Sequence, residues 1–515
     1  MQVPAHGTRT VSEADFGRMK LLDELAAAAP SNHDLELLAA EMISPLADTA
    51  KDGEDDEENP YIPAGYTYFG QFVDHDLTFD THSVFDDPTS FERASNMRTP
   101  RFDLDNVYGR GPDDQPYLFQ DSFDGTLLLG EALDNGVKDV QRNAEGRAII
   151  GDPRNDENSV VVQLQSAFIR FHNKMVGRAV AGIGTPRLTG RAAYLWAQTQ
   201  TRHHYQRIVL DDYMPRIMDP AASTVSAIFS SLSTGHRPTL KLYDLDHPPY
   251  MPVEFSVAAY RFGHSMIRPG YRMSAKPGDV AQSGPDNVRL FKIFDGETGG
   301  LRGFQRLNKG KGIDWSLFFA KGLAAGTPLG AAGAVANNAK GVRRTQYAYK
   351  IDTMVVAPIG TLPHAVAFNP SSLALRNMMR GRDFGLPSGQ DAARRIGAPV
   401  IADDKLSVRV NNDFANRKTI KAISPHFAGN APLWFYILAE AEQPVIAGVA
   451  AGKSPLELGT RLGPLGGAIV LETVVGLMLS DPESVLNPRA TWRSINGKPT
   501  FSMEELFAEI GTPLV

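Results

Sequence analysis

The chain has 515 residues, an ordinary apolar content for a soluble globular protein and no cysteine, so a disulfide framework is excluded. Its formal charge is −7, and six negative charges lie in one acidic run at 52–58; the remainder is nearly neutral and shows no basic excess for binding nucleic acid. Residues 1–20 lack a charged start followed by an apolar core, so we expect no secretory signal and a cytoplasmic or non-classically secreted protein.

Helix signals dominate along the chain and strand signals are scarce. We expect residues 1–60 to form an N-terminal extension whose acidic run is a solvated loop. Residues 160–178 carry apolar side chains at helical spacing, with Ser159 available as the N-cap. Residues 190–210 and 431–450 show a similar pattern. The predicted fold class is therefore mainly α.

Three further segments have distinctive compositions. Residues 234–252 contain four prolines and are predicted to be an irregular connector, and residues 323–340, rich in Gly, Ala and Asn, a loop. Residues 462–480 are the most apolar stretch, but they include Glu472 and several glycines. We interpret this stretch as a buried helix rather than a membrane span, and predict no transmembrane segment.

One histidine is predicted to lie on the apolar face of its helix. Val253, Val257 and Tyr260 precede His264 at spacings of four, three and four residues, which places all four side chains on one face of an α-helix. That face is suited to a buried cofactor ligand.

The most informative stretch is GQFVDHD, residues 70–76, which combines a glutamine, two acids and a histidine. The imidazole of His75 can take and return a proton, a flanking carboxylate can bind a cation or cofactor, and Phe72 can exclude water. Taken alone, the stretch also fits a structural histidine in a core.

Four more segments follow at wide separations: RTPRFDLDNVYG (98–109), GDPRNDENS (151–159), YRFGHSMIRP (260–269) and RNMMRGRDFGLP (376–387). Together with residues 70–76 they resemble the motifs of the animal-type haem peroxidases, over roughly residues 60 to 390. The resemblance implies one large helical domain at 61–515 around a buried haem b, with very little β-structure. Its motifs lie within 70–387, and residues 390–515 form a helical C-terminal part without a chemical motif.

The resemblance also implies roles for five residues. His75 matches the distal histidine, Arg154 the distal arginine and Gln71 the distal glutamine that contacts water or halide. His264 matches the proximal iron ligand, and Asn377 the asparagine that accepts its other ring N–H. Four of these residues have a structural alternative: a surface ion pair for Arg154, a cap or turn for Asn377 and a core position for either histidine.

Two carboxylates match positions at which many family members form ester bonds to haem methyl groups. These are Asp74 and Glu157, and the alternative is a hydrogen bond to nearby backbone or an ion pair with Arg154. The residue after Glu157 is Asn158, whereas the additional sulfonium link of one mammalian member requires methionine there, so that link is excluded.

An acidic constellation around residue 76 resembles the family's calcium site. Hard Ca²⁺ takes several oxygen ligands, and the spacing does not fit an EF-hand. The implied ligands are Asp76, Thr99, the carbonyl of Arg101, Asp103 and Asp105. Many family members have serine in place of Asp105, so this acid either raises cation affinity or caps a turn. The alternative is an acidic turn without metal.

The predicted function is a haem-dependent peroxidase that reduces hydrogen peroxide and oxidises a halide, thiocyanate or a small phenolic or amine donor, with a role in the response to oxidative stress. Fatty-acid dioxygenases of the wider superfamily use a tyrosine three residues before the proximal histidine. Arg261 holds that place here, and Tyr260 lies about 100° away on a helix. A dioxygenase or peroxygenase is therefore the second hypothesis, and a non-catalytic, calcium-dependent interaction protein the third.

Overall fold

The computed structural model describes residues 16–44, 56–79, 94–120, 124–274, 290–294, 300–324, 327–328, 345–364, 366–367, 369–487 and 492–514. Its α-helices are α1 (Asn32–Glu41), α2 (Gly65–Leu77), α4 (Asp105–Tyr108), α5 (Val161–Ala181), α6 (Gly190–Arg207), α7 (Met214–Ile217), α8 (Ser223–Ser233), α9 (Val253–Ser256), α11 (Ala357–Gly360), α12 (Leu373–Asp383), α13 (Gly389–Ile396), α14 (Ile420–Ile423), α15 (Leu433–Ala450), α16 (Pro464–Ser480) and α17 (Met503–Glu509).

The strands of the described residues form small two-stranded sheets: β1 (Phe16–Gly17) with β4 (Met251–Pro252), β2 (Ile43–Ser44) with β8 (Val355–Val356), β3 (Glu58–Pro63) with β7 (Tyr347–Tyr349), β5 (Gly270–Arg272) with β6 (Leu290–Lys292), and β9 (Ser407–Val410) with β10 (Asp413–Thr419). The predicted mainly α fold is confirmed. Residues 16–44 contribute Phe16, Met19 and Leu35 to the same hydrophobic core as the rest of the chain. The boundary at residue 60 stays a prediction.

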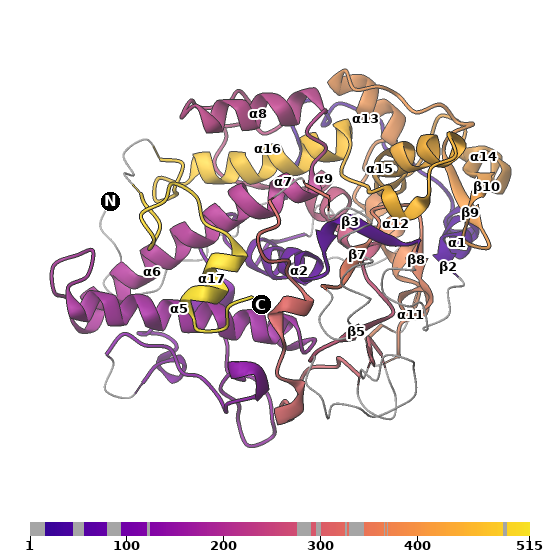
Figure 1. Cartoon of the computed structure of the whole chain (residues 1–515). Coiled ribbons are helices and arrows are strands. Elements are labelled where there is room, and N and C mark those ends of the chain that lie inside the picture. The colour runs from indigo at the N-terminus through magenta and orange to yellow at the C-terminus, as the bar shows by residue number, and fades with distance from the viewer. Residues whose placement is uncertain are drawn as a thin grey trace.

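Helix α2 lies in the middle of the molecule, with α5 and α6 on one side and α12 and α15 on the other (Figure 1). Its Phe72 stacks on Phe168 of α5, with ring centroids 4.9 Å apart. Phe69 lies edge-on to Tyr213 at 5.4 Å. This apolar packing fixes the rotation of α2 and so decides where its polar residues point.

The helices predicted at 160–178, 190–210, 431–450 and 462–480 are confirmed as α5, α6, α15 and α16. Glu472 in α16 is buried, and its Oε2 accepts the backbone N–H groups of residues 241 to 243, which explains how an apolar helix keeps an acid. Among the described helices, none is both long and apolar enough to cross a bilayer. Residues 234–250 are irregular as predicted, and most of 323–340 lies outside the described residues.

Two predicted local features are wrong. Ser159 does not cap α5, because its hydroxyl donates to the carbonyl of Leu301; Oδ1 of Asn158 instead accepts the N–H groups of Val160 and Val161. The acidic run is not a solvated loop throughout. Its residues 52–55 lie outside the described part, but Glu57 and Glu58 are buried.

The helix predicted to carry His264 is broken. Helix α9 ends at Ser256, and a separate 3-10 helix runs from Ala259 to His264. The guanidinium Nε of Arg261 donates to the Ser256 carbonyl, and the Trp434 indole donates to the Arg261 carbonyl. Side chains therefore occupy carbonyls that a continuous α-helix would use for its own backbone, and tertiary contacts override the periodicity.

Candidate active site

His75 lies on the last turn of α2 and is buried, with 5% of its surface exposed. Its Nδ1 is 2.7 Å from Oδ1 of Asn155. Asn155 donates through Nδ2 to Gln165, whose own Nε2 donates to the backbone carbonyl of Asn106. A carbonyl can only accept, so this chain of bonds fixes both amide orientations and makes His75 the donor at Nδ1.

This network determines the protonation state of His75. With its proton on Nδ1, the neutral ring leaves Nε2 as a base. Burial, with the Arg154 cation adding to it, lowers the pKa of His75 to about 3. The imidazole is therefore neutral and ready to accept a proton at physiological pH.

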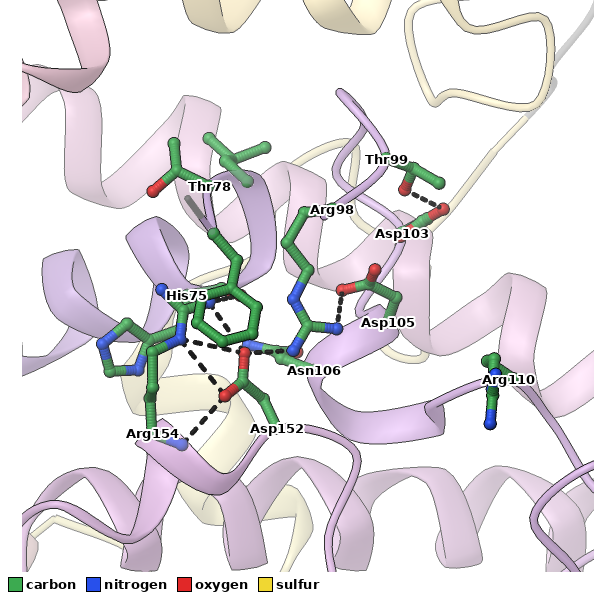
Figure 2. Close-up of polar contacts among 12 residues, drawn as sticks. His75, Thr78, Arg98, Thr99, Asp103, Asp105, Asn106, Arg110, Asp152 and Arg154 are labelled. Carbon is green, nitrogen blue, oxygen red and sulfur yellow. Dashed lines mark hydrogen bonds and ion pairs between the residues drawn. The ribbon is translucent and has the colours of Figure 1, made fainter. Parts of the chain in front are cut away.

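Arg154 lies in a short 3-10 helix, Pro153–Asp156, whose N-cap residue is Asp152. Its Nη2 donates to Oδ2 of Asp152 at 2.7 Å and to the carbonyl of His75 at 3.0 Å. Its guanidinium carbon lies 4.3 Å from the ring centroid of Phe79. Among the described residues no hydrogen-bond acceptor is found for its Nη1, so one end of the cation is available to a bound molecule. Figure 2 shows His75, Asp152 and Arg154 together.

Gln71 lies one helical turn before His75, and its side chain forms hydrogen bonds with Glu157 and Asn158. Its Nε2 donates to Glu157 at 3.1 Å, and its Oε1 accepts from Asn158 at 3.1 Å. Burial raises the pKa of Glu157 to about 7 and also raises the pKa of Asp74. Glu157 nevertheless keeps an exposed surface, and Gln71 and Asp74 are partly exposed.

His264 ends its 3-10 helix beside α12. Its Nδ1 is 2.8 Å from Nδ2 of Asn377, which is fully buried. Oδ1 of Asn377 accepts a hydrogen bond from Arg261 at 2.9 Å. The predicted pairing is present, and which of the two groups donates is set by the tautomer of His264 and the orientation of the Asn377 amide. Burial and the nearby Arg261 cation lower the pKa of His264 to about 3.

The two histidine regions meet around Asp74. This carboxyl interacts electrostatically with both Arg154 and Arg261, which lower its pKa against the effect of burial. Its Oδ1 also accepts from the Thr78 hydroxyl at 3.0 Å. The structure thus brings together residues from three motifs that are far apart in sequence.

Behind His75, carboxylate oxygens of Asp76, Asp103 and Asp105 lie within 4.8 Å of one another. Both oxygens of Asp76 are buried without a hydrogen-bond partner among the described residues. Burial and the two neighbouring acids raise the pKa of Asp76 well above its usual range. Thr99 donates to Asp103 at 2.9 Å. The side chain of Arg101 lies 3.5 Å from Asp481.

Arg98 connects this acidic cluster to the active-site arginine. It lies 3.2 Å from Asp105 and forms a short ion pair with Asp152, the residue that also holds Arg154 (Figure 2). A chain of ion pairs therefore connects the acidic cluster to Arg154 through Arg98 and Asp152.

A family model described as animal haem peroxidase matches residues 85–424, about two thirds of the chain. The chain belongs to the animal haem peroxidase family. It is 25% identical to thyroid peroxidase of Rattus norvegicus over 327 residues, covering 62% of this chain and 29% of that protein. The chain thus spans less than a third of the length of this curated relative.

Solved structures agree on the fold of this haem peroxidase family member. Peroxidase A from Dictyostelium discoideum is similar with a TM-score of 0.58 and 15% identity, covering 98% of each chain. A fatty acid alpha-dioxygenase from Oryza sativa is similar with the same TM-score and identity, covering 97% of this chain and 82% of that one. At this identity the likeness extends to the fold alone.

Sequence reasoning missed four polar residues of this candidate site. They are Arg98, Asp152, Asn155 and Gln165. Three of them lie inside the quoted motifs, so their positions were in view, but only the folded geometry shows which side chain each one contacts.

Proposed function

We propose that this chain is a haem-dependent peroxidase that reduces hydrogen peroxide and oxidises a halide, thiocyanate or small phenolic or amine donor. The observation that carries the proposal is the state of His75: a buried, neutral imidazole whose Nδ1–H is held by Asn155 and whose Nε2 is left as a base. Arg154 lies beside it with one end of its guanidinium available.

The residues present fit a bound haem. His264 is neutral, deeply placed and still partly exposed, as an axial ligand must be. Two cations, Arg154 and Arg261, and two carboxyls, Asp74 and Glu157, surround the same region. When bound, the haem would supply an iron that accepts the oxidising equivalents of peroxide.

The protein's own contribution is proton transfer and charge stabilisation. Nε2 of His75 would take the proton from one peroxide oxygen and return it to the other as the O–O bond breaks. Nη1 of Arg154 would donate to the oxygen on which negative charge develops. The bonds from Asp152 hold that guanidinium in place, and Gln71 would contact water or halide.

Asp74 and Glu157 are proposed to form ester links to the haem, in which a carboxylate oxygen would replace one hydrogen of a haem methyl group. This two-electron oxidation would use hydrogen peroxide as the oxidant, and both carboxyls keep uncovered surface. Haem that is fully released from the chain by denaturing acid extraction would rule the links out.

The decisive experiment is the absorption spectrum of the haem-supplied protein before and after one equivalent of peroxide. We expect a Soret band that shifts on peroxide, and we expect His264→Ala to lose normal haem binding because the axial nitrogen is gone. A wild-type protein that takes up no haem, or binds it without responding to peroxide, would overturn the proposal in favour of the non-catalytic alternative.

The same preparation separates peroxidase from dioxygenase. Tyr260 donates to the hydroxyl of Tyr213 at 3.4 Å, and its ring is buried. Arg261, at the position of the dioxygenase tyrosine, is engaged with Asn377. Donor oxidation should therefore survive in Tyr260→Phe, with no oxygen uptake on added fatty acid. Fatty-acid-dependent oxygen uptake that disappears in this variant would favour the dioxygenase.

The cluster behind His75 is proposed to bind Ca²⁺ through Asp76, Thr99, the Arg101 carbonyl, Asp103 and Asp105. The unpartnered oxygens of Asp76, with the carboxylates of Asp103 and Asp105 close by, match the oxygen ligands that Ca²⁺ prefers. Because Asp76 directly follows His75, the ion would hold α2 in its position.

Asp103→Asn is expected to act in opposite directions with and without the ion. In chelated protein it should raise the free energy of unfolding by on the order of 1 kcal/mol, because it removes the carboxylate that repels Asp76 and Asp105 and raises their pKa values. It should also weaken Ca²⁺ binding at least about tenfold, because a carboxylate ligand is lost. Thermal unfolding with and without Ca²⁺ measures both effects. Asp246→Asn, at an exposed position, is the control for the charge change. Equal stabilisation of both variants by Ca²⁺ would contradict the site.

A further inference from the structure

A cavity of about 410 Å³ lies between the C-terminal half of α5, α6 from Trp196 to His204, and residues 492–495. Its lining includes none of the residues assigned to the active site. Tyr205 of α6 packs on Phe72 of α2, while the preceding residue, His204, lines this cavity. The body of α6 thus separates the cavity from the active-site helix.

The cavity carries positive charge without a balancing acid. Arg178 and Arg493 line it, and its lining contains neither aspartate nor glutamate. Within the described residues, neither arginine forms an ion pair with a carboxylate. A chain of net charge −7 has abundant acids to neutralise an arginine, so two arginines without an acid in one cavity favour an anionic ligand.

One wall of the cavity is held rigidly by His204. Its Nδ1 donates to the carbonyl of Gln200 at 2.7 Å, and its Nε2 accepts the N–H of Ile495 at 2.8 Å. Both nitrogens are occupied, so the ring is a fixed structural wall that ties residues 492–495 to α6. Burial lowers its pKa to about 4, which keeps it neutral. The cavity is therefore formed before any ligand arrives.

Two tryptophans supply apolar surface. Trp196 and Trp492 both line the cavity, and the Trp492 ring meets His204 edge-on at 5.0 Å. Trp492 is 9% exposed, and its indole N–H has no hydrogen-bond partner among the described residues. A cavity of about 150 Å³ accommodates benzene, so a cavity of about 410 Å³ has room for an aromatic ring with polar substituents.

We infer that this cavity binds small aromatic carboxylates, with Arg178 and Arg493 binding the carboxylate and the ring lying against Trp196 and Trp492. This inference goes beyond the proposed peroxidase activity and does not depend on it, because binding needs neither haem chemistry nor peroxide.

The test is titration of 4-fluorobenzoate into the full-length, haem-supplied protein, followed by calorimetry and by the ¹⁹F resonance of the probe, without peroxide. We expect saturable binding with a Kd below about 1 mM. Arg178→Gln should weaken it about tenfold or more, because a charge-assisted hydrogen bond is lost. Arg237→Gln removes an exposed arginine outside the cavity and should leave binding unchanged.

The neutral isostere 4-fluorobenzamide and the ring-less anion acetate complete the design. Both should bind at least about tenfold more weakly than 4-fluorobenzoate, since each lacks one of the two features that the cavity recognises. Trp492→Phe should weaken the benzoate without loss of fold, as judged by its thermal midpoint. Absence of saturable binding, equal binding of the amide, or an unchanged Kd in Arg178→Gln would each overturn the inference. A protein that binds the probe but ignores peroxide would overturn only the peroxidase proposal.

Discussion

Replacing His75 with alanine is expected to slow the reaction of the haem-supplied protein with peroxide by roughly 10²- to 10⁴-fold, the usual contribution of a positioned general base. Haem uptake should persist, because the proposed axial ligand, His264, lies on a different element. Stopped-flow recording of the Soret band after mixing with peroxide measures the rate directly.

The physical reason is that Arg154 and Gln71, the described distal side chains beside His75, offer no neutral nitrogen base in place of its Nε2. Arg154 is a cation held by Asp152, and Gln71 is an amide with no useful basicity. The loss should therefore appear in the proton-transfer step, while peroxide can still reach the site.

His172 provides a matched control for the loss of a buried imidazole. It is fully buried, and burial lowers its pKa to about 4. Its Nδ1 lies 3.1 Å from the hydroxyl of Tyr108 and its Nε2 2.9 Å from the carbonyl of Gly125, so both nitrogens serve the fold. His172→Ala should lower stability and leave the peroxide rate of the folded protein within a few-fold. A His75→Ala protein that reacts at the wild-type rate would show that His75 is not the base.

The long helices could be predicted from the sequence because their apolar periodicity agrees with their final packing. Helices α5, α6, α15 and α16 are of this kind, since each buries a continuous apolar face or is buried all round. The segment before His264 has the same periodicity but forms a broken helix, because Arg261 and Trp434 occupy its carbonyls. The local sequence pattern cannot reveal that a hydrogen-bond donor about 170 residues away, Trp434, takes a carbonyl of this segment.

The candidate site likewise contains features that the sequence predicts and features that only tertiary contacts decide. His75, Arg154 and His264 could be proposed because each lies in a recognisable motif. The orientation of His75 depends on Asn155 and Gln165, and amides leave no periodic signal in a sequence. The direction of a hydrogen bond is harder still to predict, because it depends on what the far end of each amide contacts.

Arg409→Met is expected to lower the free energy of unfolding by about 3–5 kcal/mol, a large share of the stability of a typical domain. Arg409 is 1% exposed on β9. It forms a short ion pair with Glu57 and a 2.7 Å hydrogen bond to Asp352, and its Nε lies 3.7 Å from Glu442. The substitution leaves three buried carboxyls from distant segments with one cation fewer.

A matched set of variants distinguishes buried charge from lost packing. Arg306→Met removes an exposed arginine that pairs with Glu131 and should cost less than about 1 kcal/mol. Adding Glu57→Gln and Asp352→Asn to Arg409→Met should recover much of the loss, because the uncompensated charges disappear with the cation. Thermal midpoints at one scan rate compare all four proteins. A deficit that the added amides do not reduce would locate the effect in packing.

The deficit of Arg409→Met should also depend on pH. Burial raises the pKa of Asp352 well above its usual range, and the Arg409 cation opposes that rise. Without the cation the pKa of Asp352 in the folded state rises further, so the folded protein binds a proton that the unfolded chain releases. Stability is then gained as pH falls, and the difference from wild type should be smaller at pH 5 than at pH 8. An equal deficit at both pH values would mean that Asp352 does not carry the uncompensated charge.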